Sequence, residues 1–422
     1  MRRLFLPVLM LATLTAPAGA QTLRERFSQL FTFGDCGEPL CLDVNSAVHG
    51  DHYSPSVVQG ENNLLAFLTG AIGQSISSLP FAAATSGVTF SFETGVPVPT
   101  AVSPGPIFGE RAQTLGRGRF LVAAIVNGIA YNNIRGESLD DLRFLFTHQN
   151  VGDPALGNPT FENDVIEVVT DIDLSLLVTS LMMTYGIADR VDLGVALPIV
   201  HASLSGASLA QVEPYQATTP HLFGTESAPS LIAVSDADGS ATGLGDVALR
   251  MKVNAYLGEE GGISIIGDVR LPTGDEENFL GTGATTLRVF AVASTTYGRF
   301  SPHLNAGYFY TNGENQPSRA TGVLGFDHLI SESVTIAGEL LGSLQVGNFW
   351  ALPDPVIFTA PEVRTLELTS IPERKDHIMH ASFGAKFSPG ADLRIVGNVL
   401  VPLTKASIQP TAVWTVGLER TF

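Results

Sequence analysis

The feature that most constrains this chain is a long alternation of apolar and charged side chains. From Gly245 to Leu257 every odd position is apolar or glycine, whereas the even positions include Asp246, Arg250 and Lys252. Successive side chains of a β-strand point to opposite faces, so this segment predicts a strand with one apolar and one charged face. The same split recurs in three further segments, 190–199, 263–271 and 392–403. A soluble β-sandwich and a membrane β-barrel both contain such strands, so other features must distinguish them.

The N-terminus has the composition of a secretory signal. In MRRLFLPVLMLATLTAPAGAQT, two arginines precede an apolar run from Leu4 to Leu14, and small residues follow at Ala18 and Ala20. This pattern predicts a signal peptide of residues 1–20 and export of the mature chain. An uncleaved anchor is the alternative, but the run is shorter than the roughly 20 residues that a membrane-spanning helix needs.

Strand and loop lengths favour the membrane barrel. No apolar run after the signal reaches the roughly 18 residues of a helical span, although 45% of the residues are hydrophobic and only 15% are charged. Alternating segments such as 244–257 and 334–346 exceed the roughly 9–11 residues with which a tilted strand crosses a bilayer. Short turns alternate with long loops, an asymmetry typical of outer-membrane barrels with periplasmic turns. The long loops are expected at 132–163, 204–242, 272–284 and 347–375.

These criteria predict an all-β fold, a transmembrane antiparallel up-and-down β-barrel of about twelve strands with a small N-terminal helical plug. The barrel is expected at 117–422 and the plug at 21–116. The spans are expected at 117–131, 164–185, 189–203, 243–257, 261–272, 285–297, 299–311, 320–330, 332–346, 376–388, 391–403 and 410–422. An even number of strands places both chain ends in the periplasm. Fourteen strands are the alternative, if GVTFSFE (Gly87–Glu93) pairs with PIFGERAQTL.

The acidic segment LPTGDEENFLGTG interrupts the alternation and is expected to form an extracellular hairpin loop. Its glycines supply turn conformations, and its carboxylates are Asp275, Glu276 and Glu277. A divalent cation is one possible ligand of these side chains. Their spacing matches no calcium loop, and a charge cluster on a loop is more often simply solvated.

Four segments of the chain resemble a known family. They are 170–204, ATGLGDVALRMKVNAY, DVRLPTGDEENFLGTGATTLRVFAVAS and GRFSPHLNAGY. These segments are similar to the bacterial outer-membrane "transporter" family labelled with the meta-pathway of phenol degradation, from about residue 85 onward. The succession of GLGD and LPTGDEEN is the most specific part. The resemblance implies a barrel that passes small, often aromatic compounds, and it brings no catalytic residues.

Residues 21–116 are organised differently from the barrel. Apolar residues recur at helical spacing from Leu23 to Phe31 and again from Leu65 to Leu79. Two short amphipathic helices are therefore predicted. Because an apolar helix of an exported protein must be covered, we expect these helices to plug the lumen or to cap the periplasmic mouth.

The chain has two cysteines, Cys36 and Cys41, in the sequence CGEPLC. In an oxidising, exported setting such a close pair predicts a small-loop disulfide. A metal site with His49 and His52 is the alternative, although it lacks a second cysteine pair. No metal or cofactor is expected.

The charged face of the strands predicts the side chains of the lumen, where solute-binding residues are sought. Both signs occur, which favours ion pairs that fill a narrow interior over a charge-selective pore. The candidates are Asp171, Asp173, Arg190, Asp192, Asp246, Arg250, Lys252, Asp268, Arg270, Arg288, Glu339, Lys386, Asp392, Arg394 and Glu419.

The net charge of −18 makes nucleic acid an unlikely partner, because phosphate binding needs a basic face. Outer-membrane lipid and lipopolysaccharide are the expected surroundings, with divalent cations as bridges to the acidic loops. Phe422 ends a strand with Trp414, Val416 and Leu418 in the same phase, which resembles the signal read by the outer-membrane assembly machinery. Arg420 departs from that pattern because it falls on the lipid-facing phase.

The sequence favours a channel over an enzyme. It contains neither H-E-x-x-H nor G-x-S-x-G. His380 and Ser382 share a strand face with lumenal Glu339 nearby, but a hydrogen-bond network is the more common role of such residues. We therefore predict passive passage of a small hydrophobic solute. A structural or lipid-hydrolase-like barrel with a closed lumen is the alternative.

Overall fold

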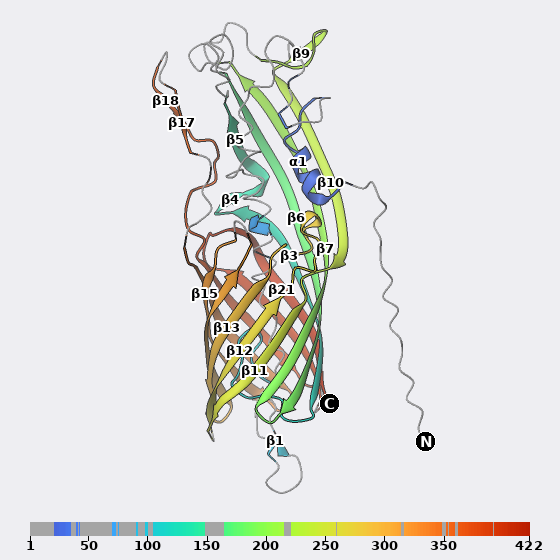
Figure 1. Cartoon of the computed structure of the whole chain (residues 1–422), viewed down its shortest axis with the longest axis vertical. Helices are drawn as coiled ribbons and strands as arrows, with labels where there is room; N and C mark the ends of the chain where they lie inside the picture. The colour runs from blue at the N-terminus through green and yellow to red at the C-terminus, as the bar shows by residue number, and fades with distance from the viewer. Residues whose placement is uncertain are drawn as a thin grey trace, which may run out of the picture.

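The computed structural model of the chain is a β-barrel with a tall extension at one end (Figure 1). No helix among the described residues is long and apolar enough to cross a membrane. The predicted signal peptide and both cysteines lie outside those residues. The structure describes residues 21–34, 39–40, 42, 70–72, 75, 90–91, 98–99, 104–147, 164–214, 221–258, 260–313, 316–347, 352, 354–358, 362–390 and 392–422.

Twelve antiparallel strands close the barrel, each paired with the next and the last paired with the first. They are β3 (Phe120–Ile134), β6 (Val165–Ala188), β7 (Val191–Glu213), β11 (Ala248–Leu257), β12 (Gly261–Arg270), β13 (Thr286–Thr295), β14 (Phe300–Thr311), β15 (Arg319–Ser331), β16 (Val334–Gln345), β19 (Ile378–Phe387), β20 (Leu393–Pro402) and β21 (Ile408–Thr421). Each coincides with one predicted span, so the barrel and its strand number are confirmed. Strands β1 (Phe90–Ser91) and β2 (Val98–Pro99) pair with each other in a separate sheet, which rules against fourteen.

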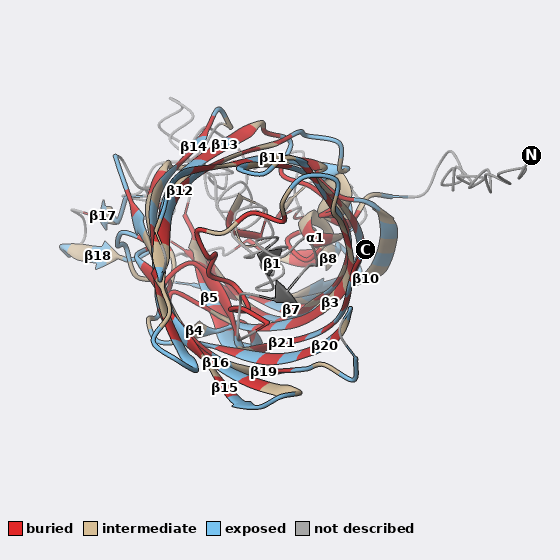
Figure 2. Cartoon of the chain, turned by 90° about the horizontal axis from the view of Figure 1, so that it is seen from below, coloured by how far each residue is buried: buried red, intermediate tan, exposed pale blue. Residues whose placement is uncertain are grey.

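The outer wall of the barrel is apolar. Outward side chains such as Leu181, Met251, Ile265 and Trp414 are exposed, whereas their inward neighbours are buried (Figure 2). A closed barrel surrounded by exposed apolar side chains is stable in lipid, where only helices and closed barrels satisfy every backbone group. An even-stranded, single-chain barrel of this kind belongs in the bacterial outer membrane, with the short turns and the C-terminus at the periplasmic end (Figure 1).

Strands β6 and β7 continue beyond the membrane and build the extension. Their outer parts, 165–175 and 203–213, pair with each other, with β5 (Leu142–Phe146) on one side and β10 (Ile232–Leu244) on the other. The prediction of a loop over 204–242 was therefore wrong for much of its length. The shorter elements are β4 (Glu137–Ser138), η2 (Leu139–Asp141), β8 (Phe223–Thr225), β9 (Ala228–Ser230), η3 (Glu276–Asn278), β17 (Val356–Phe358) and β18 (Arg364–Leu366).

Helix α1 (Leu23–Gln29) fills the concave side of the extension. It begins with a capping box, in which Glu25 N donates to Thr22 Oγ1 at 3.2 Å and Thr22 N to Glu25 Oε2 at 2.8 Å. Leu23 and Phe27 are buried, and the ring of Phe31, just beyond the helix, lies 5.5 Å from that of Phe144 in β5.

The first predicted helix thus exists, but it packs in the extracellular extension and not in the lumen or at the periplasmic mouth. Small residues on the strands permit this packing, since a Cβ at Gly239 would lie 2.9 Å from Leu23. Of the second predicted helix, residues 70–72 and 75 are described, and they are helical.

Candidate functional site

Residues 104–115, called here the plug segment, cross the lumen of the barrel without regular secondary structure. All of them are buried except Gln113, which is partly exposed. An irregular backbone enclosed by a barrel must find partners for its polar groups, because buried amides and carbonyls are costly to leave unpaired. Side chains of the barrel wall provide these partners.

Glu339 of β16 holds the first part of the plug segment. Its carboxylate accepts hydrogen bonds from Phe108 N at 3.0 Å and from Gly109 N at 2.7 Å. His303 Nε2 of β14 lies 3.3 Å from the same carboxylate, and both side chains are fully buried. A side chain at position 109 would collide with the imidazole of His303, so glycine is required for this close approach.

The rest of the plug segment is held by three side chains of the barrel wall, an asparagine, a serine and an aspartate. Glu110 N donates to Asn305 Oδ1 at 2.6 Å, and Asn305 Nδ2 returns a bond to Glu110 O at 3.0 Å. Ala112 N donates to Ser294 Oγ at 2.9 Å. Leu115 N donates to Asp192 at 2.9 Å. The plug segment is therefore fastened at separate points rather than by a strand ladder.

Charged pairs join the plug segment to both sides of the barrel. Glu110 lies 2.7 Å from Arg250 and 3.2 Å from Lys252. Arg111 pairs with Asp327, whose side chain is fully buried. Ion pairs in such dry surroundings depend on good geometry, since removal of one partner leaves an uncompensated charge.

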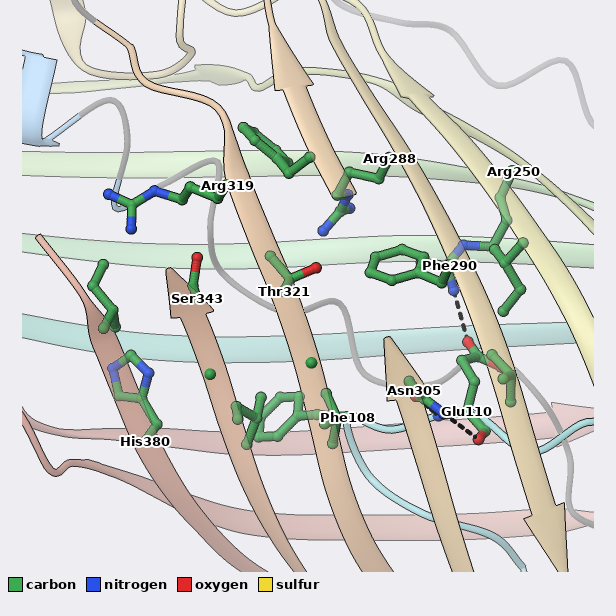
Figure 3. Close-up of a pocket in the computed structure, with 18 residues that line it drawn as sticks. Phe108, Glu110, Arg250, Arg288, Phe290, Asn305, Arg319, Thr321, Ser343 and His380 are labelled. Carbon is green, nitrogen blue, oxygen red and sulfur yellow. Dashed lines mark hydrogen bonds and ion pairs between the residues drawn. The ribbon is translucent and has the colours of Figure 1, made fainter. Parts of the chain in front are cut away.

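A cavity of about 130 Å³ lies beside the plug segment in the extracellular half of the lumen (Figure 3). Phe108 and Glu110 of the plug segment form part of its wall. The remaining lining comes mainly from the extracellular halves of β11 to β16 and of β19. Its apolar lining is Phe108, Ile266, Phe290, Val292, Phe309, Val323, Leu341 and Ile378, and its polar lining is Glu110, Arg250, Arg288, Asn305, Arg319, Thr321, Ser343 and His380.

The structure brings eleven of the predicted lumenal residues into the barrel interior. Asp192, Arg250, Lys252 and Glu339 contact the plug segment, and Arg250 and Arg288 also line the cavity. Asp268 of β12 lies 3.2 Å from Arg250 and 2.7 Å from Arg288. The others are Asp246, Arg270, Lys386, Arg394 and Glu419, all buried.

Four predicted lumenal residues lie elsewhere. Asp171 and Asp173 are exposed on the outer face of β6, because in the extension the inner face is occupied by Ile172 and Leu174, which pack in its core. Arg190 is exposed in the turn between β6 and β7, and Asp392 is exposed directly before β20. The assignment of all polar strand positions to the lumen was therefore wrong where the strand leaves the membrane and where it turns.

Asp246 organises the acidic loop rather than a solute path. Its carboxylate accepts hydrogen bonds from Gly274 N at 3.0 Å, from Thr282 N at 2.9 Å and from Thr282 Oγ1 at 2.7 Å. These bonds fold the loop between β12 and β13 back onto the barrel rim, where Phe279 and Leu280 are buried.

Of the predicted acidic residues of this loop, Glu277 contacts helix α1. Asp275 accepts a bond from Glu277 N at 3.1 Å, and Glu277 pairs with Arg24 at 2.7 Å. Asn278 Oδ1 accepts the backbone N–H of Leu23 at 3.1 Å. Glu276 is exposed. Among the described residues, no group of three or more His, Cys, Asp and Glu side chains is arranged to hold a metal ion.

Ser382 and His380 do not form a nucleophile and base pair. Ser382 Oγ donates to Asn398 Oδ1 at 2.9 Å and to Glu339 at 3.4 Å. In the part of the chain that the structure describes, no hydrogen bond joins Ser382 to His380, which lines the cavity. Glu339 faces His303 instead.

Glu110, Asn305, Asp327 and Arg319 were not among the residues predicted from the strand alternation. The segment PIFGERAQTL contains two charges and has no face compatible with lipid, which was the available signal of an interior position. Its partners on the wall lie about two hundred residues away in sequence, for example 195 positions for Asn305, so spacing could not identify them.

Residues 163–326 match the family model described as "Putative MetA-pathway of phenol degradation". The search of curated proteins finds no match. Among solved structures, the chain is similar to an outer-membrane channel from Pseudomonas putida, with 11% identity and a TM-score of 0.45 over 74% of this chain and 98% of that one. A FadL homologue from Pseudomonas aeruginosa has 9% identity and a TM-score of 0.33, over 72% and 90%. The residues that match the phenol-degradation family model run from β6 into β15 of this outer-membrane β-barrel, as the resemblance in the sequence indicated.

Proposed function

We propose that the barrel is a passive channel for small hydrophobic or aromatic compounds and that the plug segment is its gate. The cavity carries this proposal, because the rings of Phe108, Phe290 and Phe309 line a volume of about 130 Å³. Apolar cavities of roughly 150 Å³ bind benzene, so a single-ring solute fits in size and polarity. The description of the matched family, which concerns phenol degradation, points to the same class of solute.

The path would run from the extracellular loops into the cavity and onward past the plug segment. The barrel wall is a continuous strand ladder, which cannot open without breaking many backbone bonds. The plug segment is held by separate side-chain bonds, such as those of Asn305 and Glu339, and can be displaced at lower cost. A gradient of the solute suffices to drive passage. Within the predicted domain 21–116, we therefore assign the plug role to residues 104–115.

Solute flux into vesicles tests the proposal. Refolded full-length protein should pass phenol faster than protein-free vesicles do, and it should exclude glucose. The double substitution Asn305→Ala and Glu339→Ala removes acceptors of three plug amides and should raise phenol flux severalfold.

The matched control is Asn127→Ala, a buried lumenal asparagine that accepts a hydrogen bond from Thr415 at 2.7 Å. It should leave flux unchanged. If neither the intact protein nor the double variant passes any solute, the barrel is a closed structural protein and the channel proposal is wrong.

The proposal includes no catalytic step. Ser382→Ala tests this point, because its hydroxyl is the candidate nucleophile of the alternative. We expect no ester hydrolysis by the intact protein. An esterase activity that disappears in Ser382→Ala would establish an enzyme instead.

We also propose that Phe422 is the contact for the assembly machinery and that lipopolysaccharide surrounds the extracellular rim. Phe422 is 60% exposed at the end of the barrel, and the guanidinium of Arg420 lies over its ring at 4.8 Å. Phe422→Ser should reduce the amount of folded barrel in the outer membrane. Equal amounts of both proteins would contradict the first role, and thermal stability that is insensitive to chelators would count against cation bridges to lipopolysaccharide.

A further inference from the structure

Arg319 is a buried cation that forms no ion pair with a carboxylate among the described residues. It begins β15, is 2% exposed and lines the cavity. Its Nη1 donates to the backbone carbonyl of Asp376 at 2.8 Å. The described part of the protein offers no acceptor to its Nε and Nη2. A buried charge usually has a partner, because removing an ion from water costs several kcal/mol.

The carboxylate of Asp376 is already engaged by other groups. Arg135 donates to it from Nε at 3.1 Å and from Nη2 at 3.0 Å, and Ser407 N donates at 2.6 Å. Arg319 is therefore left with the carbonyl alone.

The other two arginines of the cavity each form an ion pair with a carboxylate. Arg250 pairs with Glu110 at 2.7 Å and Arg288 with Asp268 at 2.7 Å. Within the described residues, Arg319 is thus the cavity arginine that forms no ion pair with a carboxylate. In the part of the chain that the structure describes, this positive charge of the cavity wall has no carboxylate paired with it.

Hydroxyls and aromatic rings line the cavity together with Arg319. Figure 3 shows Ser343 beside Arg319, and Thr321 between Arg319 and Phe290. Thr321 Oγ1 is also without a hydrogen-bond partner among the described residues. Phe290 and Phe108 face the remaining space (Figure 3).

We propose that Arg319 is a carboxylate-binding subsite and that the channel takes monoanionic solutes with one aromatic ring or a short alkyl body. A guanidinium presents two parallel N–H groups to a carboxylate, and Nε and Nη2 are the pair left open here. The single uncompensated charge selects a monoanion, and the phenylalanine rings select an apolar body. This inference rests on the proposed channel function and names a solute class for the same cavity.

Calorimetric titration of the full-length protein in non-ionic detergent tests the subsite with benzoate and its neutral isostere benzamide. Benzoate should bind at least about tenfold more tightly, since hydrogen bonds to a charged group are the stronger kind. Arg319→Gln should weaken benzoate about 10- to 100-fold and leave benzamide unchanged. Arg143→Gln, at an exposed arginine of β5, is the matched control and should change neither ligand.

Equal binding of benzoate and benzamide to the intact protein, or benzoate binding that survives Arg319→Gln, overturns the subsite, as does the absence of binding by either ligand. Should Arg319→Gln fail to fold, Arg319→Lys keeps the charge but not the paired donors and should still weaken benzoate. The channel proposal is judged separately, because the phenol flux through the Asn305→Ala and Glu339→Ala variant does not depend on Arg319. If phenol passes but benzoate is not preferred over benzamide, the channel proposal stands and the subsite proposal is wrong.

Discussion

The two halves of strand β6 have the same alternation and opposite surroundings. Odd residues point outward along the whole strand. In the extension these outward residues are Asp171 and Asp173, whereas in the barrel they are Leu181 and Met183. The outer face is therefore wet above the membrane and lipid-covered within it.

The interiors of the two regions also differ. In the extension, Ile172 and Leu174 form a dry core with helix α1. In the barrel, Met182 of β6 packs in an apolar cluster with Leu115 of the plug segment, whereas Lys252 and Glu339 on other strands hold the plug segment by polar contacts. Alternation thus establishes which residues share a face, but the medium on each side decides which face is apolar.

The largest expected effect is in the dry core. Phe31→Ala removes a buried ring that packs against Phe144 and Phe146, and it should cost the extension about 3–5 kcal/mol. Limited proteolysis of α1 under native conditions measures this local unfolding. The control Val234→Ala, on the outer face of β10 with 75% exposure, should change the cleavage rate little. An equal response of the two variants would show that the extension has no core of its own.

The outer faces can be compared directly with one substitution at two sites. Leu181 in the barrel and Leu209 in the extension are both 41% exposed. Leu181→Arg should cost about 2–4 kcal/mol, because arginine would face the middle of the bilayer, whereas Leu209→Arg should be nearly neutral in water. Chemical unfolding of both variants in vesicles provides the measurement. Similar losses of stability at the two sites would show that the membrane boundary does not lie between Leu181 and Leu209.

The smallest expected effect is at the contact between the acidic loop and helix α1. Arg24 and Glu277 are 37% and 43% exposed, so Glu277→Gln should cost only about 0.2–1 kcal/mol. The loss should fade at high salt, where exposed pairs are screened. The proteolysis of α1 at low and high ionic strength tests both statements. A loss that is large and independent of salt would give this pair a role that its exposure does not explain.

The barrel could be predicted from the sequence because all of its strands cross the same lipid layer and therefore repeat the same alternation of apolar and polar residues. The extension could not, since 204–213 and 232–242 are rich in Ser, Ala, Gly and Asp and have the composition of a loop. Small residues are needed there for α1 to approach, as at Gly239, and this need arises only from the tertiary packing.

Of the candidate site, only the residues of the barrel wall could be predicted from the sequence. Strand phase identified Lys252, Asp268 and Glu339 as lumenal, but not the chain that they bind. Glu110 has no alternation around it, and its partners come from distant strands. Arg319 was missed because it lies at the edge of a loop, one residue before the predicted start of its span.

The most direct test of the gate is to tether the plug segment to the wall. Ala112 N lies 2.9 Å from Ser294 Oγ, so Ala112→Cys and Ser294→Cys introduce thiols at two residues that are in contact. Cys36→Ser and Cys41→Ser form the background, and Ser294→Cys alone in that background is the control. Oxidation should stop phenol flux in the double-cysteine protein and reduction should restore it, while the control responds to neither. Undiminished flux through a fully cross-linked barrel would show that solutes pass without movement of the plug segment, and would contradict the account.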